Sequence, residues 1–262
     1  MPDASALEDS KAYAVRAITL TQPLRWLALG WRDFARCPLP GLLHGLVLSG
    51  FGAVLLALAW NRFWFLAGAF SGFLLMGPIA ATGLYALSRA LERGEPATLG
   101  VALRTWLPRD HRLVLFGVLL SLAGTGWVLT SASLITGFAE APVRNPMDFI
   151  RHVVLSPRSW LFETWLALGG LLAAPVYGSS VVAIPLLLDR PISVMAAVLT
   201  SWRCVLANPA PLALWAALLM ALSGLGMITG VGLVIVVPWL AHASWHAYRD
   251  LVQPPAPPAA AR

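Results

Sequence analysis

Two histidines four residues apart, His242 and His246, are the side chains of this sequence best suited to bind a metal or haem iron. A spacing of four places both imidazoles on one face of a helix, and paired imidazoles bind transition metals and haem iron. His44 can converge with them. Yet two histidines are an incomplete ligand set, and the positive charge of Arg249 beside them would repel a bound metal cation. The competing interpretation is that these histidines hydrogen-bond helices to one another.

Other polar side chains fall near the same predicted membrane boundary. We group seven of them as a candidate polar cluster on the cytoplasmic side: His44, Tyr85, Arg89, His242, His246, Tyr248 and Arg249. The sequence contains no Gly-x-Ser-x-Gly elbow, His-Glu-x-x-His motif or phosphate-binding glycine loop. We therefore predict no catalytic residues, no metal ligands and no cofactor, and a protein that is not an enzyme.

The positions of the carboxylates and cysteines argue against ion-coupled transport and against a disulfide or thiolate metal site. Glu163 and Asp189 lie at the ends of one apolar stretch and Asp250 follows another, so no acidic residue is expected at mid-membrane. Ion-coupled transporters usually keep an ionisable group there, which makes coupled transport a weaker hypothesis. Cys37 and Cys204 form no Cys-x-x-Cys motif, so we expect neither a disulfide nor a thiolate metal site.

Long apolar stretches must position these groups. Of the 262 residues, 58% are apolar and 11% charged, and the mean hydropathy is +0.75, as in membrane proteins. A bilayer core about 30 Å thick needs roughly 20 apolar helical residues, and residues 39–60, 63–88, 113–138 and 161–188 meet this need. Residues 211–248 are long enough for two spans with a turn at Ser223-Gly224-Leu225-Gly226. The prediction is an all-α membrane protein with six transmembrane helices.

The distribution of basic residues predicts the orientation. Fourteen of the 18 Lys and Arg residues fall on one side of the spans, and the other side holds Arg62, Arg144, Arg151 and Arg158. By the positive-inside rule both termini are cytoplasmic. The net charge of +6 then matches anionic lipid headgroups, so the lipid bilayer is the expected partner and nucleic acid is not. We divide the chain into a cytoplasmic segment (1–18), a six-helix transmembrane domain (19–251) and a disordered cytoplasmic tail (252–262).

Short amphipathic segments precede three of the spans. In the first, Leu24, Leu27, Trp31 and Phe34 recur at helical spacing while arginines gather on another face. Segments before spans three and five have similar stripes, so each is expected to lie at the membrane interface. Six side chains are predicted to anchor them there: Trp26, Trp31, Arg32, Trp106, Trp202 and Arg203. An elbow that supports a helix pair and a surface that recruits a cytoplasmic partner are both compatible with this pattern.

The segments also form a repeat. Trp-Arg-x5-Pro-x-Pro occurs at Trp31 and again at Trp202, each time entering a span, and a weaker copy without Pro-x-Pro precedes span three. Pro78, Tyr85 and Arg89 align without gaps to Pro238, Trp245 and Arg249. These matches predict three parallel-repeat helix pairs, each preceded by an interfacial amphipathic helix, in which prolines kink the even-numbered spans.

Several short motifs resemble a family of predicted bacterial integral membrane proteins known as domain of unknown function 2189. They are Ile-Thr-Leu at 18–20, Pro-Leu-Arg-Trp at 23–26, Gly-Trp-Arg at 30–32, Gly77-Pro78 with Tyr85, Pro-Leu-Leu-Leu-Asp-Arg at 185–190, and His-Ala-Ser-Trp-His-Ala-Tyr-Arg-Asp-Leu at 242–251. The resemblance spans roughly residues 14–251. It implies a bacterial inner-membrane protein and supplies no activity, substrate or cofactor.

Three hypotheses for function follow. The leading one is a non-enzymatic scaffold or accessory factor of the inner membrane. The alternative is a small-molecule or lipid transporter or channel without a coupling carboxylate, and the third is a haem- or metal-binding membrane protein that uses His242 and His246. Three Gly-x-x-x-Gly motifs, which begin at Gly41, Gly68 and Gly226, favour close helix packing within the chain. Such faces can also pack against a second copy of the chain, which gives a homo-oligomer, or against a membrane protein partner.

Overall fold

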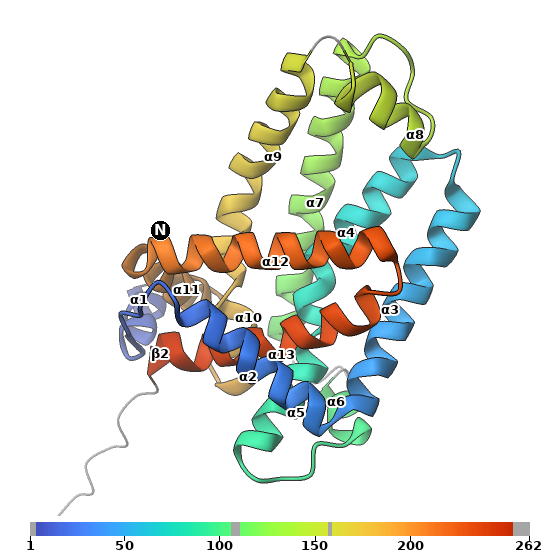
Figure 1. Ribbon diagram of the computed structural model, residues 1–262. Coiled ribbons are helices and arrows are strands. Elements are labelled where there is room, and N and C mark those ends of the chain that lie inside the picture. The colour runs from blue at the N-terminus through green and yellow to red at the C-terminus, as the bar shows by residue number, and fades with distance from the viewer. Residues whose placement is uncertain (1–3, 106–110, 157–158, 254–262) are drawn as a thin grey trace, which may run out of the picture.

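The computed structural model describes residues 4–105, 111–156 and 159–253 as a bundle of helices (Figure 1). In chain order the elements are α1 (Ala4–Lys11), β1 (Ala14–Val15), α2 (Gln22–Arg36), α3 (Pro38–Ala59), α4 (Phe63–Ala80), α5 (Thr82–Glu92), α6 (Leu99–Thr105), α7 (His111–Phe138), α8 (Pro146–Phe149), the π-helical turn η1 (Ile150–Val154), α9 (Ser159–Ser180), α10 (Ala183–Asp189), α11 (Val194–Ala207), α12 (Pro209–Thr229), α13 (Leu233–Leu251) and β2 (Val252–Gln253).

The helical prediction is confirmed for the described residues, and helices occupy all six predicted span positions. Within the described part of the chain, four stretches are long and apolar enough to cross a membrane: Pro38–Ala59, His111–Phe138, Trp160–Asp189 and Pro209–Thr229. Figure 1 shows α12 running across the direction of α7 and α9, whereas parallel helix pairs would align them. The six-span layout of three parallel repeats therefore stays a prediction.

The turn predicted within residues 211–248 was misplaced. Helix α12 continues through Ser223, Gly224 and Gly226 and ends at Thr229. Gly230 makes the turn, because its φ of 64° lies in the left-handed region that favours glycine. Gly226 instead lets two helices approach, since a Cβ added there would lie 3.2 Å from the Leu233 side chain.

Two of the predicted even-numbered spans are each broken into two helices. The break after α4 falls at Ala81, three residues beyond Pro78, and the break after α9 falls at Val181 and Val182, shortly before Pro185. Pro185 lies in the first turn of α10, where the N–H bond that proline cannot donate is not needed, whereas Pro78 lies within α4, ahead of the break. Helix α13 nevertheless passes Pro238 without a break.

The two copies of Trp-Arg-x5-Pro-x-Pro have the same local structure. Cys37 ends α2 with φ −135° and ψ 62°, and Asn208 ends α11 with φ −135° and ψ 53°. Each donates its backbone N–H to the carbonyl four residues earlier, at 3.1 Å in both cases. Because a residue before proline avoids the helical conformation, the first helix must stop there and the next begins at the proline. The weaker third copy includes Trp106, which lies outside the described residues.

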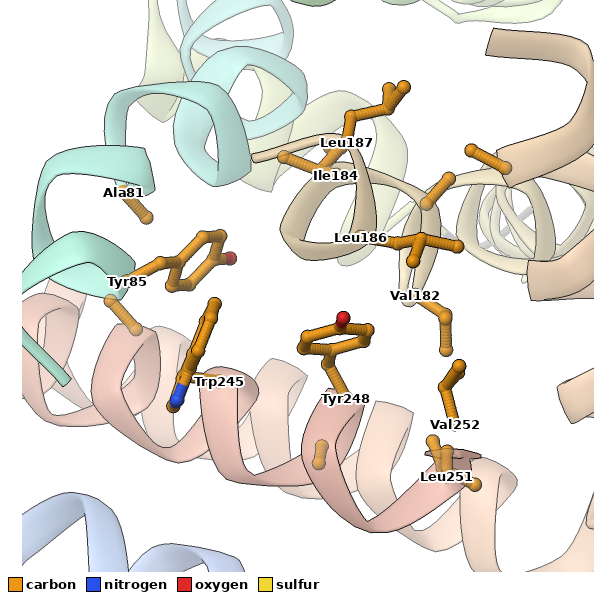
Figure 2. Close-up of a cluster of buried hydrophobic side chains, with 14 of the residues drawn as sticks. Ala81, Tyr85, Val182, Ile184, Leu186, Leu187, Trp245, Tyr248, Leu251 and Val252 are labelled. Carbon is orange, nitrogen blue, oxygen red and sulfur yellow. The ribbon is translucent and has the colours of Figure 1, made fainter. Parts of the chain in front are cut away.

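The C-terminal helix α13 lies at the centre of the packing. It contacts α2, α3, α5 and α12, and Figure 2 shows its Trp245 and Tyr248 facing Tyr85 and Leu186 in the buried core. On the α2 side, fully buried Trp26 meets the ring of Trp215 edge-on, with centroids 5.5 Å apart. The first and last parts of the chain therefore share one core.

The two ends of the described chain also pair directly. Strands β1 and β2 are antiparallel, with Ala14 opposite Gln253 and Val15 opposite Val252. The backbone N–H of Arg16 donates to the carbonyl of Leu251 at 3.0 Å. The tail predicted to be disordered from residue 252 thus begins as a paired strand, and residues 254–262 lie outside the described chain.

Candidate functional site

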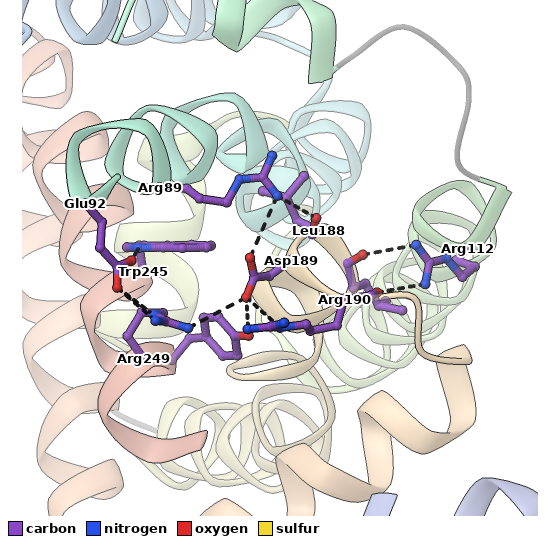
Figure 3. A network of polar contacts seen from close by, with 10 residues as sticks. Arg89, Glu92, Arg112, Leu188, Asp189, Arg190, Trp245 and Arg249 are labelled. Atoms are coloured by element: carbon purple, nitrogen blue, oxygen red, sulfur yellow. Dashed lines mark hydrogen bonds and ion pairs between the residues drawn. The ribbon is translucent and has the colours of Figure 1, made fainter. Parts of the chain in front are cut away.

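The C-terminal ends of α5, α10 and α13 meet around one buried carboxylate, Asp189 (Figure 3). Its side chain is 4% exposed. Arg190 Nε lies 3.2 Å from Asp189 Oδ2. Arg89 Nη1 lies 3.8 Å from Oδ1, and Arg249 Nη1 lies 3.8 Å from Oδ2. The Tyr248 hydroxyl donates a hydrogen bond of 2.8 Å to Oδ2. One acidic side chain thus joins three helices that are far apart in sequence.

A second carboxylate, Glu92, completes this network at the end of α5. Arg249 donates to the same Glu92 oxygen from Nε at 3.0 Å and from Nη2 at 2.8 Å. The Trp245 indole donates to the other oxygen at 3.3 Å. A pocket of about 290 Å³ lies beside these groups, and its lining also includes Arg93. Its carboxylates are therefore already paired with arginines of the same chain.

Helix α10 is held at its C-terminal end by an arginine from α7. Arg112 Nη1 donates to the carbonyls of Arg190 and Ile192 at 3.0 and 2.7 Å, and Nη2 donates to that of Leu187 at 3.2 Å. The last carbonyls of a helix lack partners within the helix and carry partial negative charge. A guanidinium supplies both the donors and the positive charge that they require.

The histidines belong to a separate network between α2, α5 and α13. His246 Nε2 lies 2.8 Å from Asp33 Oδ2, and the Ser88 hydroxyl donates to that same oxygen at 2.7 Å. His242 Nδ1 lies 2.7 Å from the Ser88 oxygen. Because Ser88 gives its single proton to Asp33, His242 must donate through Nδ1. Hydrogen bonds of His242 and His246 therefore connect α13 to α2 and α5.

Protonation of Asp33 should loosen this network. Burial raises the pKa of Asp33, but hydrogen bonds from His246 and Ser88 and the charges of the two imidazoles outweigh it, so the pKa lies below its ordinary value of 3.8. A carboxylate with a lowered folded pKa stabilises the fold above its unfolded pKa, and this contribution is lost as pH falls through the folded pKa. We expect the melting temperature of the wild type to fall below pH 4 more steeply than that of Asp33→Asn. If the melting temperatures of the wild type and of Asp33→Asn fell in parallel from pH 6 to pH 3, the ionised Asp33 carboxylate would not stabilise the fold.

The predicted polar cluster divides between the two networks. Arg89, Tyr248 and Arg249 join the Asp189 network, and His242 and His246 join the Asp33 network. Tyr85 is buried beside Trp245 (Figure 2). His44 is buried in α3, where its Nδ1 lies 2.8 Å from the carbonyl of Pro40.

The residues that sequence reasoning missed are the acceptors and donors at the centre of each network: Asp33, Ser88, Glu92, Arg112 and Asp189. Asp33 offered one signal, because it is the single acidic residue among the arginines of its helix. Asp189 offered another, since it ends an apolar stretch directly before Arg190.

The predicted interfacial anchors have different surroundings. Trp26 is fully buried and donates to Asp250 at 2.7 Å, so its prediction as a membrane anchor was wrong. Trp31 is 47% exposed. Trp202 donates to Ser179 at 3.0 Å, and Arg203 donates to the carbonyls of Ser10 and Tyr13 in the N-terminal segment at 2.6 and 3.2 Å. Trp106 lies outside the described residues.

Helix α2 has three distinct faces. The face buried in the protein carries Pro23, Trp26, Gly30, Asp33 and Phe34. Leu24 and Trp31 form an exposed apolar face, and Arg25, Arg32 and Arg36 form an exposed basic face. The predicted apolar stripe is therefore divided, because Phe34 faces the protein while Leu24 and Trp31 face outward.

Neither native cysteine should react with a maleimide while the protein is folded. Both thiols are buried, and the reactive species is the thiolate. Burial and the nearby Asp33 raise the pKa of Cys37 to about 11, against a smaller lowering by Arg36. We expect mass spectrometry to find no adduct after N-ethylmaleimide treatment at pH 7 and two adducts after unfolding. Stoichiometric labelling of either thiol before unfolding would contradict the packing around α11 and the α2–α3 junction.

The described residues contain no group of three or more His, Cys, Asp or Glu side chains placed to hold a metal ion.

Residues 65–189, from α4 to the end of α10, match the model of a family described as predicted integral membrane protein (DUF2189). The match confirms the family resemblance over this part of the chain, which includes Arg89, Glu92 and Asp189. The opening and closing motifs lie outside the matched residues. No curated protein and no solved structure matches the chain.

Proposed function

We propose that this membrane protein is a non-enzymatic scaffold or accessory factor of the bacterial inner membrane, with six spans and both termini in the cytoplasm. In this proposal the ends of α5, α10 and α13, together with α2, form a rigid cytoplasmic platform. The interfacial helices α2 and α11 border that platform and present it to a membrane protein partner or to a second copy.

The observation that carries this proposal is the mutual pairing of the polar side chains. Asp189 and Glu92 bind arginines and aromatic donors, and Asp33 binds Ser88 and His246. A transport pathway needs polar groups that face water and can exchange their partners for a substrate. The Asp189 and Asp33 side chains are largely buried, and buried groups that satisfy one another instead make a packed and rigid structure.

Two further features support the orientation. Pairing of β1 with β2 places both strands on the same side of the membrane, which agrees with an even number of crossings. The basic face of α2 adjoins its exposed apolar face, so the helix can rest in the interface with its arginines among anionic headgroups. Both features are expected of a cytoplasmic platform that lies against the inner leaflet.

Thiol labelling in native membranes distinguishes a packed platform from a water-filled pathway. In a variant without Cys37 and Cys204, single cysteines replace Ala86 or Ala247, which are buried on α5 and α13. Inverted vesicles are then treated with a membrane-impermeant maleimide. We expect these two positions to label only after the membrane is dissolved and the protein unfolded.

Glu95→Cys is the matched control, because residue 95 is exposed just beyond α5. It should label rapidly in inverted vesicles and not in right-side-out vesicles if the platform is cytoplasmic. Labelling at residues 86 and 247 at a rate near that of residue 95 would favour a transport pathway and overturn the scaffold proposal.

A further inference from the structure

A basic and aromatic pocket lies at the turn between α3 and α4, at the opposite end of α3 from the polar networks. Its volume is about 260 Å³. Val143, from the segment before α8, lies in its wall, and the Phe63 backbone N–H donates to the Arg144 carbonyl at 2.9 Å. The other lining residues are Asn61, Arg62, Phe63, Trp64, Phe65 and Arg144.

The guanidinium groups of the two arginines in this pocket are not paired with an acidic side chain in the described part of the chain. Among the described residues, neither the Arg62 nor the Arg144 guanidinium has a hydrogen-bond or ion-pair partner. The nearby Asp148 carboxylate accepts the backbone N–H of Arg144 at 3.0 Å and does not pair with its guanidinium. The pocket beside Asp189 differs, because two carboxylates line it and already bind arginines. Of these two pockets, the one at the α3–α4 turn has two arginines and no acidic residue in its lining.

The remaining walls of the pocket are apolar and continue onto the outer surface of the bundle. Phe63 stacks on Phe149 with ring centroids 5.5 Å apart, which holds the aromatic wall in place. Phe65 is 58% exposed, and Leu58 at the end of α3 is 81% exposed. In a membrane protein such surfaces face acyl chains, while aromatic and arginine side chains occupy the headgroup level. The pocket thus offers charge on one side and an apolar surface on the other.

We propose that this pocket binds the phosphate-bearing headgroup of an anionic phospholipid. The guanidinium groups of Arg62 and Arg144 hold the phosphate, since arginine matches phosphate geometry with paired donors. The Asn61 amide provides a neutral hydrogen-bonding group, and the acyl chains lie against Phe65 and Leu58. The proposal concerns the chemistry of this site and does not depend on the scaffold function.

Native mass spectrometry of the detergent-purified protein tests the site directly. The protein is titrated with phosphatidylglycerol or with phosphatidylcholine of the same acyl chains, and the bound fraction gives an apparent Kd for each lipid. We expect tighter binding of phosphatidylglycerol. Each basic group near an anionic lipid contributes roughly a factor of five in affinity, so Arg62→Gln and Arg144→Gln should each weaken binding about five-fold and together about 25-fold.

Arg151→Gln is the matched control. Arg151 is exposed in η1 near the same end of the bundle but does not line the pocket, so its replacement should leave the Kd within two-fold of the wild type. An unchanged melting temperature of the double variant checks its folding. Equal loss in Arg151→Gln, or wild-type affinity in the double variant, would overturn the proposal. Displacement of the lipid by millimolar inorganic phosphate would assign the site to a free anion instead.

Discussion

Asp189→Asn should destabilise the protein by about 3 kcal/mol, near the lower end of the range for breaking a buried ion pair. The Asp189 side chain is 4% exposed, and its replacement leaves three arginines without their common carboxylate. Those arginines remain partly exposed, so water recovers some of the loss. For a chain of this size, 3 kcal/mol corresponds to a decrease of roughly 6–12 °C in melting temperature, which scanning fluorimetry in detergent can measure.

Glu163→Gln provides the comparison for this variant. Glu163 is an exposed carboxylate near the start of α9, and an exposed substitution of this kind usually changes stability by less than about 0.5 kcal/mol. If Asp189→Asn melted within 1 °C of Glu163→Gln, Asp189 could not be the group that joins the ends of α5, α10 and α13.

Gly45→Ala should separate α3 from α13. A Cβ at this position would collide with the carbonyl oxygen of Val234 and would lie 2.7 Å from the Val234 Cα. Both are backbone atoms, so one helix must move, and overpacking of this kind costs about 1–3 kcal/mol. The melting temperature should therefore fall although alanine is the better helix former.

Gly50→Ala on the same helix separates packing from helix propensity. A Cβ at Gly50 would meet no atom within 4 Å, so this variant should match the wild type or exceed it by up to about 1 kcal/mol. Equal melting temperatures for Gly45→Ala and Gly50→Ala would contradict the close contact between α3 and α13. They would also leave the Gly41/Gly45 motif available for contacts between two copies of the chain.

The positions of most helices could be predicted because they depend on local chemistry. Apolar runs of sufficient length indicate helices in lipid, and Trp-Arg-x5-Pro-x-Pro predicts where one helix stops and the next begins. The end of α12 could not be located in this way. Several glycines fall close together there, and only the three-dimensional structure distinguishes Gly230, which makes the turn, from Gly226, which allows close packing.

The candidate site was predicted in part. Spacing along one helix related His242 to His246 and placed both near Arg249, because such relations are local. The partner Asp33 is 213 residues from His246, and no pattern in a single sequence links them. Trp26 was misjudged for the same reason, since an amphipathic helix can turn a tryptophan toward lipid or toward a partner such as Trp215. The direction of the tryptophan side chain depends on tertiary packing.

Cross-linking of the two ends of the chain tests the central claim, that both ends close one platform on the cytoplasmic side. Ala14 and Gln253 face one another in the β1–β2 pair, and directly opposed residues in antiparallel strands are close enough for a disulfide. With Cys37 and Cys204 replaced, the Ala14→Cys/Gln253→Cys variant is oxidised in native membranes. We predict an intramolecular disulfide that a membrane-impermeant reductant cleaves in inverted vesicles but not in right-side-out vesicles. No cross-link, or cleavage only in right-side-out vesicles, would contradict the account.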